Sequence, residues 1–235
     1  MKILEINDLW YFAVAAVVCY FIGCFNFAVL IAHFKKKNIR EMGSGNPGTM
    51  NMTRSLGFKF GLINFFCDAL KGGLPVLAAY LLFKNYVFEG TEYSVADFAR
   101  YFFGLFVIIG HIFPVTMAFK GGKGIASTMG VFIFALPCES WWYIFIVVAF
   151  LVCILLYIVL TEWGSMGSLI GVTLLSVFQA VLFVDRYAAD MFNLWSILTF
   201  SLLLLINLLT WTAHRKNIFR LLAGEEHRTA VRKRK

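Results

Sequence analysis

Charged residues are scarce in this chain: they make up 14% of its 235 residues, whereas hydrophobic residues make up 60%. Soluble domains have about 25% charged and about 45–50% apolar residues. A separate soluble domain is excluded, because membrane spans use most of the 235 residues. The composition predicts an all-α, polytopic helical membrane protein that forms a single integral membrane domain over residues 1–235.

Motifs for metals and disulfides are also lacking. The five cysteines lie in or beside apolar stretches, without a Cys-x-x-Cys pair or a histidine at ligand spacing. We therefore expect no metal, no cofactor and no disulfide bond.

Long hydrophobic runs are the main feature that is present. A helix needs about 20 apolar residues to cross the hydrocarbon core of a bilayer. About seven transmembrane helices are predicted, at residues 10–34, 58–83, 97–113, 124–137, 141–162, 166–184 and 191–212. The run at 124–137 is short and is expected to end at Pro137, and a re-entrant helix would give the same pattern. The first run is too long for a signal peptide and is interpreted as a retained span.

Basic residues gather in alternate loops. If the N-terminus lies outside, sixteen of the 21 Lys and Arg residues fall in or beside cytoplasmic segments and four fall outside. By the positive-inside rule this bias predicts an outside N-terminus and a cytoplasmic C-terminus. The same bias explains the net charge of +8, because the basic residues flank spans and contact membrane lipids. No nucleic-acid partner is therefore expected. The bias also places every glycine-rich loop on the cytoplasmic face.

A glycine-rich loop follows the first run and reads Gly-Ser-Gly-Asn-Pro-Gly-Thr-Met-Asn-Met-Thr-Arg over residues 43–54. Glycines permit positive φ angles, small polar side chains donate hydrogen bonds, and an arginine can grip a phosphate with two of them. The alternative is a polar connector between two spans. The predicted substrate-binding groups of this loop are Gly43, Ser44, Gly45, Asn46, Asn51 and Arg54.

A second loop has the sequence Phe-Lys-Gly-Gly-Lys-Gly over residues 119–124. It is not a nucleotide-binding loop, because Gly124 stands where a Walker A motif has Ser or Thr. Adjacent backbone amides and lysine charge at a helix start can still hold an anion. The alternative is a basic cytoplasmic loop with glycine turns. The predicted binding groups are Lys120, Gly121, Gly122, Lys123 and Gly124.

Further polar residues stand near the ends of spans. Ser165 and Ser168 are spaced i, i+3 and are either substrate ligands or helix caps. Asp68 and Lys71 lie one turn apart inside a predicted span, as an ion pair or as support for a site. The segment that begins at His214 is able to bind a phosphate and a polyol, and the alternative is an amphipathic helix on the lipid surface.

Taken together, these motifs resemble the bacterial membrane family of acyl-phosphate:glycerol-3-phosphate acyltransferases (PlsY type). The motifs follow the family's order along nearly the whole chain. They are Gly-Ser-Gly-Asn-Pro-Gly at 43–48 with Asn51 and Arg54, Asp68-Ala-Leu-Lys71-Gly72, His111-Ile-Phe-Pro114 with residues 119–124, Ser165 with Ser168, and His214-Arg-Lys-Asn217 with Arg220 and Gly224-Glu225. The chain departs from the family pattern at Gly48-Thr49-Met50-Asn51 and at Glu162-Trp163.

The resemblance implies transfer of an acyl group from acyl phosphate to glycerol 3-phosphate at the cytoplasmic face of the bacterial cell membrane. It implies roles in the chemistry for Ser44, His214 and Asn217, phosphate contacts by Arg54, Lys120, Lys123 and Arg215, and structural support by Asp68, Lys71 and Glu225. The acyl chain is expected to lie between helices. The mixed anhydride needs no enzyme nucleophile, so binding and positioning are expected to carry the reaction.

Two other functions fit parts of the pattern. A CoA-dependent glycerolipid acyltransferase often carries His-x4-Asp, and no histidine here is followed five places on by aspartate. An anion or organophosphate transporter could use the same phosphate loops, with contacts near the bilayer midplane and broken helices. Turnover by detergent-solubilised protein, which has no compartments, would separate enzyme from transporter.

Overall fold

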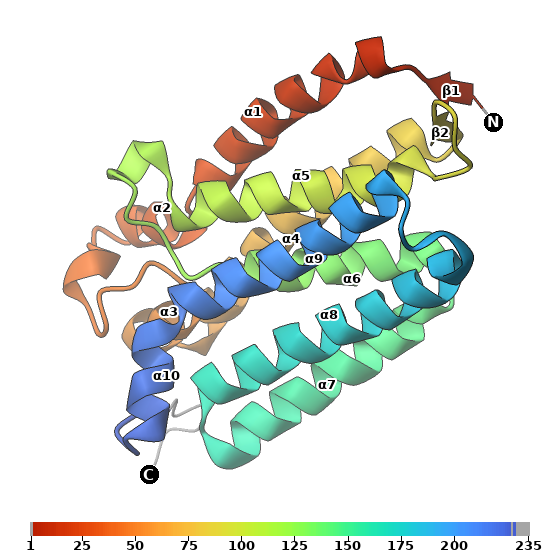
Figure 1. Ribbon diagram of the computed structural model, residues 1–235. Coiled ribbons are helices and arrows are strands. Elements are labelled where there is room, and N and C mark those ends of the chain that lie inside the picture. The colour runs from red at the N-terminus through yellow and green to blue at the C-terminus, as the bar shows by residue number, and fades with distance from the viewer. Residues whose placement is uncertain (1, 227, 229–235) are drawn as a thin grey trace.

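The computed structural model describes residues 2–226 and 228 and is almost entirely helical (Figure 1). The helices are α1 (Trp10–Cys24), α2 (Phe27–Phe34), α3 (Thr49–Leu56), α4 (Phe58–Phe83), α5 (Val95–Ile112), α6 (Ile125–Glu139), α7 (Tyr143–Thr161), α8 (Gly164–Tyr187), α9 (Leu194–Ala213) and α10 (Arg215–Leu222). Two short parallel strands, β1 (Lys2–Leu4) and β2 (Tyr86–Phe88), tie the N-terminus to the α4–α5 connection.

In the part of the chain that the structure describes, six helical segments are long and apolar enough to cross a membrane, which confirms a polytopic helical membrane protein. They are Ile6–Phe34, Phe58–Phe83, Val95–Met117, Tyr143–Thr161, Gly164–Asp190 and Leu194–Ala213. Helix α6, with 15 residues, is shorter, so a seventh span stays a prediction. Helix α5 is central, with 72% of its most apolar window buried, whereas the value for α7 is 11%. An all-apolar, exposed helix such as α7 is suited to contact with lipid.

The span predicted over residues 10–34 matches the apolar segment Ile6–Phe34, which contains two helices and not one continuous helix. The run is interrupted at Phe25 and Asn26, and α2 starts afresh with the Asn26 side chain accepting a hydrogen bond from the Val29 N–H. Pro137 also does not end α6, which continues to Glu139. The proline removes only its own N–H, and the Ser140 N–H still donates to the Leu136 carbonyl.

Glycine crossings bring helices into backbone contact. A Cβ at Gly23 of α1 would overlap the Val107 carbonyl of α5, and one at Gly110 would overlap the Tyr20 carbonyl. Likewise, a Cβ at Gly72 of α4 would overlap the Ser127 carbonyl of α6. Small residues allow such close approach between helices in a membrane. These crossings fix α1 on α5 and α4 on α6.

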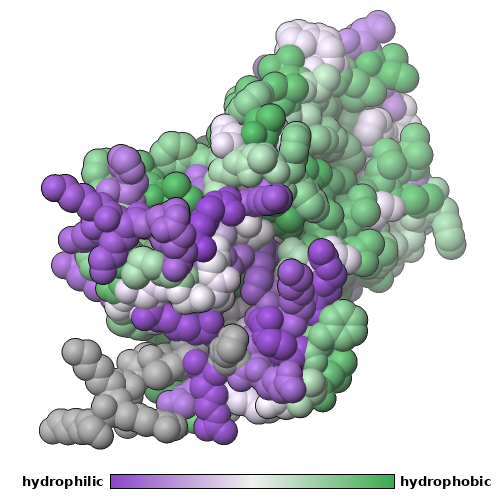
Figure 2. All heavy atoms as spheres, turned by 90° about the vertical axis from the view of Figure 1, so that its left-hand side faces the viewer, coloured by the Kyte–Doolittle hydropathy of each residue, from purple (hydrophilic) through white to green (hydrophobic). Residues whose placement is uncertain are grey.

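The two ends of the helix bundle differ in what they gather. The short helices α2, α3 and α10 and the loop before α6 lie at one end, on the left of Figure 1, and the two strands lie at the other. Figure 2 shows hydrophilic side chains gathered over the first of these ends. The sequence motifs therefore converge at one end of the bundle, although they are far apart along the chain.

Candidate active site

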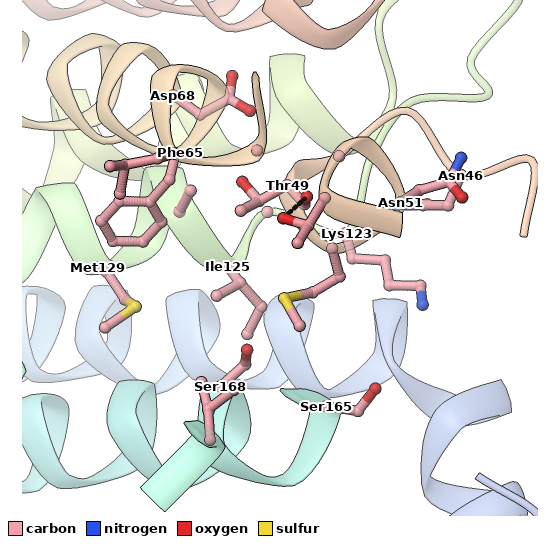
Figure 3. A pocket seen from close by; sticks show the side chains of 18 of the residues that line it. Asn46, Thr49, Asn51, Phe65, Asp68, Lys123, Ile125, Met129, Ser165 and Ser168 are labelled. Atoms are coloured by element: carbon pink, nitrogen blue, oxygen red, sulfur yellow. Dashed lines mark hydrogen bonds between the residues drawn. The ribbon is translucent and has the colours of Figure 1, made fainter. Parts of the chain in front are cut away.

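A cavity of about 320 Å³ opens at this polar end. It brings together most of the residues predicted from the sequence (Figure 3). Those that line it are Ser44, Asn46, Asn51, Arg54, Asp68, Lys123, Gly124, Ser165, Ser168, His214 and Asn217. Thr49, Met50, Thr53 and His111 line it as well and were not selected as site residues from the sequence.

Several helices begin at the polar part of the cavity. Residues in the first turn or N-cap of α3, α6, α8 and α10 line its wall, among them Thr49, Gly124, Ser165 and Asn217. The N-terminus of a helix carries a partial positive charge and backbone N–H groups that point outward. Four such ends around one cavity favour the binding of an anion.

Cationic side chains add to this field. The Lys123 ammonium donates a hydrogen bond to the Asn217 side-chain oxygen. Burial, and after it the charges of Arg220 and Arg54, lower the pKa of Lys123 to about 8, although the charge of Glu226 acts in the opposite direction. Burial also lowers the pKa of Arg54. The cations thus disfavour one another's charge, and a bound phosphate would relieve that repulsion.

A hydrogen-bonded network joins α8, α10 and the segment that follows α10. The Asn217 amide donates to the Ser165 hydroxyl at 2.8 Å and to Glu226 at 2.7 Å, and Ser165 donates to Glu226 at 2.6 Å. Arg220 donates to the other Glu226 oxygen at 2.8 Å. Burial would raise the pKa of Glu226, but these hydrogen bonds, with Ser165 first, hold it below its usual value. The carboxylate therefore stays charged and organises the network.

This network places Glu226 where the sequence predicted Glu225. Glu225 is exposed, and its backbone N–H donates to the Arg220 carbonyl at 2.8 Å. The preceding Gly224 has a φ of +73°, which ends α10, and Glu226, not Glu225, contacts Ser165, Asn217 and Arg220. Because the two acids are adjacent, the sequence alone could not indicate which of them joins the network.

His214 lies at the junction of α9 and α10 and is buried. Its Nδ1 lies 2.9 Å from the Thr210 carbonyl oxygen. Because a carbonyl can only accept, Nδ1 carries the proton and Nε2 has the free lone pair. Burial lowers the pKa of His214 to about 4, so the ring is neutral near pH 7. A neutral imidazole with a free Nε2 can accept a proton.

Asn51 has a different place from the one predicted. Its side-chain oxygen accepts the Ser44 N–H at 2.9 Å, and its amide donates to the carbonyls of Met42 at 2.9 Å and Ile39 at 3.2 Å. The Asn51 side chain thus shapes the loop rather than offering its donors to a ligand. Gly43 and Gly45 have φ values of +57° and +70°, and a Cβ at Gly43 would overlap the Asn51 oxygen.

The second loop is also built differently from the prediction. The Gly121 and Gly122 N–H groups donate to the Ile112 and His111 carbonyls at 3.0 and 3.1 Å, so they are used within the chain. Lys120 is exposed, and its carbonyl accepts a hydrogen bond from Arg40. The glycines permit close packing on His111, and the loop thereby carries Lys123 into the cavity.

Three more predicted residues have defined places. Arg215 is exposed and donates to the Thr212 carbonyl at 3.3 Å, outside the cavity wall. Ser168 donates to the Gly164 carbonyl of its own helix at 2.7 Å. Asp68 and Lys71 form a buried ion pair with a distance of 2.9 Å, and only Asp68 lines the cavity. Within residues 2–226 and 228, no cluster of His, Cys, Asp or Glu side chains could hold a metal ion.

The other part of the cavity is apolar. Its walls come from α4 and α7, with Ile125 and Met129 of α6 between them, and Figure 3 shows Phe65 and Met129 at the end away from Asn46, Lys123 and Ser165. Outer wall residues are half exposed: Phe66 keeps 56% and Leu155 51% of its surface. Along membrane-spanning helices, such an opening faces lipid. The site is thus shaped for a molecule with an anionic head and an apolar tail. The apolar residues of the two long walls are Phe58, Leu62, Phe65 and Phe66 of α4 and Leu151, Ile154, Leu155 and Ile158 of α7.

Comparisons with known proteins agree with this geometry. A family model described as glycerol-3-phosphate acyltransferase matches residues 13–224. The chain is 35% identical to the glycerol-3-phosphate acyltransferase of Finegoldia magna, over 92% of this chain and 95% of that protein. It is 33% identical to that of Aquifex aeolicus, over 90% of this chain and 96% of the relative.

Solved structures of the same kind are also similar. The crystal structure of PlsY, an integral membrane glycerol 3-phosphate acyltransferase, in its glycerol 3-phosphate form matches with a TM-score of 0.70 and 29% identity, over 93% of this chain and 95% of that chain. Its lysophosphatidic acid form matches with a TM-score of 0.69. These findings confirm the resemblance that the motifs indicated. The chain therefore belongs to the glycerol-3-phosphate acyltransferase family and is an integral membrane acyltransferase.

Proposed function

We propose that this protein transfers the acyl group of an acyl phosphate to the sn-1 hydroxyl of glycerol 3-phosphate, and so makes 1-acyl-glycerol 3-phosphate for phospholipid synthesis. The observation that carries the proposal is the division of one cavity into a cationic end and an apolar, lipid-facing end. An acyl phosphate has this shape, with a charged head and a hydrocarbon tail. Glycerol 3-phosphate would share the cationic end, where Arg54 and Lys123 lie.

In the reaction, the acceptor hydroxyl oxygen attacks the carbonyl carbon of the acyl phosphate. The carbon–oxygen bond to phosphate then breaks, and phosphate leaves with the electron pair. Holding the two reactants side by side lowers the entropic part of the barrier. The cations and helix N-termini stabilise charge on the departing phosphate. An enzyme nucleophile is not needed, because the anhydride is already activated.

The hydroxyl proton has two possible acceptors at this site. One is Nε2 of His214, whose neutral ring lines the cavity together with Asn217 and Lys123. The other is the phosphate of the donor itself. A His214→Asn variant separates them: loss of turnover with unchanged KM indicates the histidine, whereas near-normal turnover indicates the phosphate.

The same proposal includes the orientation of a single membrane domain over residues 1–235. Seven crossings, with the N-terminus outside, would put the cavity on the cytoplasmic face of the bacterial membrane, where soluble glycerol 3-phosphate is available. The basic residues around the polar end support this orientation. Externally added thiol reagent should label a cysteine placed at Glu89 and should not label one placed at Asn46. The reverse pattern would reject the orientation.

The activity itself is tested with detergent-purified protein. Palmitoyl phosphate should release phosphate only when glycerol 3-phosphate is present, and the product should be the 1-acyl ester. Turnover in detergent distinguishes the enzyme from the alternative, an anion or organophosphate transporter, which needs two compartments. Turnover with acyl-CoA and none with acyl phosphate would reject the proposed donor.

A further inference from the structure

The break in the first apolar run lies directly behind the 43–54 loop. Helix α1 ends at Cys24 and α2 begins at Phe27, although no proline occurs between residues 10 and 34. The glycine crossing of Gly23 with Gly110 fixes the end of α1 on α5. The break is therefore held at a defined place in the bundle, and its carbonyl groups lack the partners that a continuous helix would supply.

Side chains from two other segments satisfy those carbonyls. The Lys71 ammonium of α4 donates to the Phe25 carbonyl at 2.6 Å. The Thr116 hydroxyl, in the turn before Lys120, donates to the Cys24 carbonyl at 3.3 Å. Unpaired carbonyls among apolar helices would be costly, so these contacts stabilise the break. The break thereby joins α1 to both α4 and the second glycine-rich loop.

Lys71 belongs to a buried polar group that also reaches the first loop. It pairs with Asp68, and Asp68 accepts a hydrogen bond from the Asn64 amide at 3.0 Å. The same amide lies 3.2 Å from the hydroxyl of Thr49, the first residue of α3, to which it donates. Asp68 and Lys71 keep only 1% and 6% of their surface exposed. This group therefore holds the loop at Thr49, where α3 begins.

Asn26 holds the same loop two residues earlier, at Pro47. Its amide donates to the Pro47 carbonyl within the loop at 3.2 Å, while its oxygen accepts the Val29 N–H at 3.0 Å as the cap of α2. The side chain thus has two separate functions, one toward α2 and one toward the loop. Neither Asn26 nor Lys71 lines the cavity.

We infer that the break is a positioning device for the phosphate loop: Asn26 and Lys71 hold residues 43–54 in the conformation that binds a substrate phosphate. The inference rests on the proposed function for its kinetic consequence. Both residues act through the loop, because neither touches the cavity. Loss of either contact should weaken binding of the phosphate that the loop holds, and should leave the chemical step nearly unchanged.

Asn26→Ser provides the sharpest test. Serine can still cap α2, but it is too short to reach Pro47. We expect Asn26→Ser and Asn26→Ala to raise KM for one phosphate substrate about three- to tenfold, with kcat nearly unchanged. Amide hydrogen exchange over residues 43–48 should become faster in both. If serine restores the wild-type KM and exchange, Asn26 is only a helix cap and the inference is wrong.

Asn193→Ala is the matched control. Asn193 caps α9 in the same way, by accepting the Trp195 N–H at 2.9 Å, but it lies at the other end of the bundle. Its loss should lower the thermal midpoint and leave KM and loop exchange at wild-type values. An equal rise in KM in this variant would show a general effect of lost capping and would overturn the inference.

A second experiment removes both charges of the Asp68–Lys71 ion pair, by combining Asp68→Asn and Lys71→Met in one protein. This double variant avoids an unpaired buried charge, so it should fold, but the Phe25 carbonyl loses its donor. Loop exchange should again rise, and wild-type exchange would reject the role of Lys71. Hydrogen exchange needs no turnover. Absence of activity in the wild-type protein would therefore reject the proposed function without deciding the positioning device.

Discussion

The two ends of the helix bundle differ in how their cationic and anionic side chains are balanced. At the end with the strands, Arg100 pairs with Asp97 and Glu139, and Arg186 pairs with the same two acids. Two cations thus meet two anions, and the group is neutral. At the cavity end, the cations Arg54, Lys123 and Arg220 lie around the carboxylate of Glu226, whereas Asp68, which also lines the cavity, is paired with Lys71. Charge that is balanced within the fold contributes to stability, whereas an excess of one sign leaves a site for a ligand.

The largest effect should come from breaking the neutral group. Arg100→Met leaves the buried Asp97 and Glu139 with the half-exposed Arg186 as their cationic partner, beside hydrogen bonds from Tyr187 and Gln179. Loss of one partner from a buried ion group costs about 3–5 kcal/mol. We expect a large fall in the thermal midpoint in detergent and an unchanged KM in the protein that remains folded. A changed KM with an unchanged midpoint would contradict the division between the two ends.

Substitution of Arg54 tests whether phosphate binding at the cavity end requires the geometry of the guanidinium group or only its positive charge. Arg54→Lys should lose nearly as much activity as Arg54→Ala, because lysine cannot copy two parallel hydrogen bonds to a phosphate. The loss should be about 1.5–3 kcal/mol, or roughly ten- to 150-fold in kcat/KM. Steady-state kinetics on the three proteins measures this. Full activity of Arg54→Lys would mean that positive charge alone is required.

Glu226 and Glu225 form a matched pair. Glu226→Ala removes the acceptor shared by Ser165, Asn217 and Arg220 and should lower kcat/KM about tenfold. Glu225→Ala should have wild-type kinetics, because that side chain is exposed. Equal losses in the two variants would contradict the network observed in the structure.

The smallest effect is a pH dependence. The lowered pKa of Lys123, about 8, means that its charge is lost as the pH rises through this value. Between pH 7.5 and 8.5 the protonated fraction, and with it kcat/KM, should fall about threefold. Lys123→Arg should abolish this fall, and His214 stays neutral throughout because its pKa is about 4. A flat profile in the wild-type protein would show that the Lys123 charge is not needed for binding.

The sequence by itself determined the membrane class, the family and most helix positions. The predicted span 58–83 coincides with α4, and the other long runs lie within a few residues of the observed helices. These features depend on local properties, namely the length of apolar runs and short motifs whose residue types indicate phosphate binding. The presence of Ser44, Arg54, Lys123, His214 and Asn217 around one cavity follows the same motifs.

The tertiary structure decided what depends on contacts between distant residues. The break at Phe25 is stabilised by Lys71 and Thr116, which lie 46 and about 90 positions away, so the apolar run alone contains no signal for it. Asn51 has a structural role because backbone groups of its own loop lie within hydrogen-bond distance. Glu226 has one because Ser165, on another helix, lies within hydrogen-bond distance. A hydrogen bond depends on position in space, and residue type limits only which partners are possible.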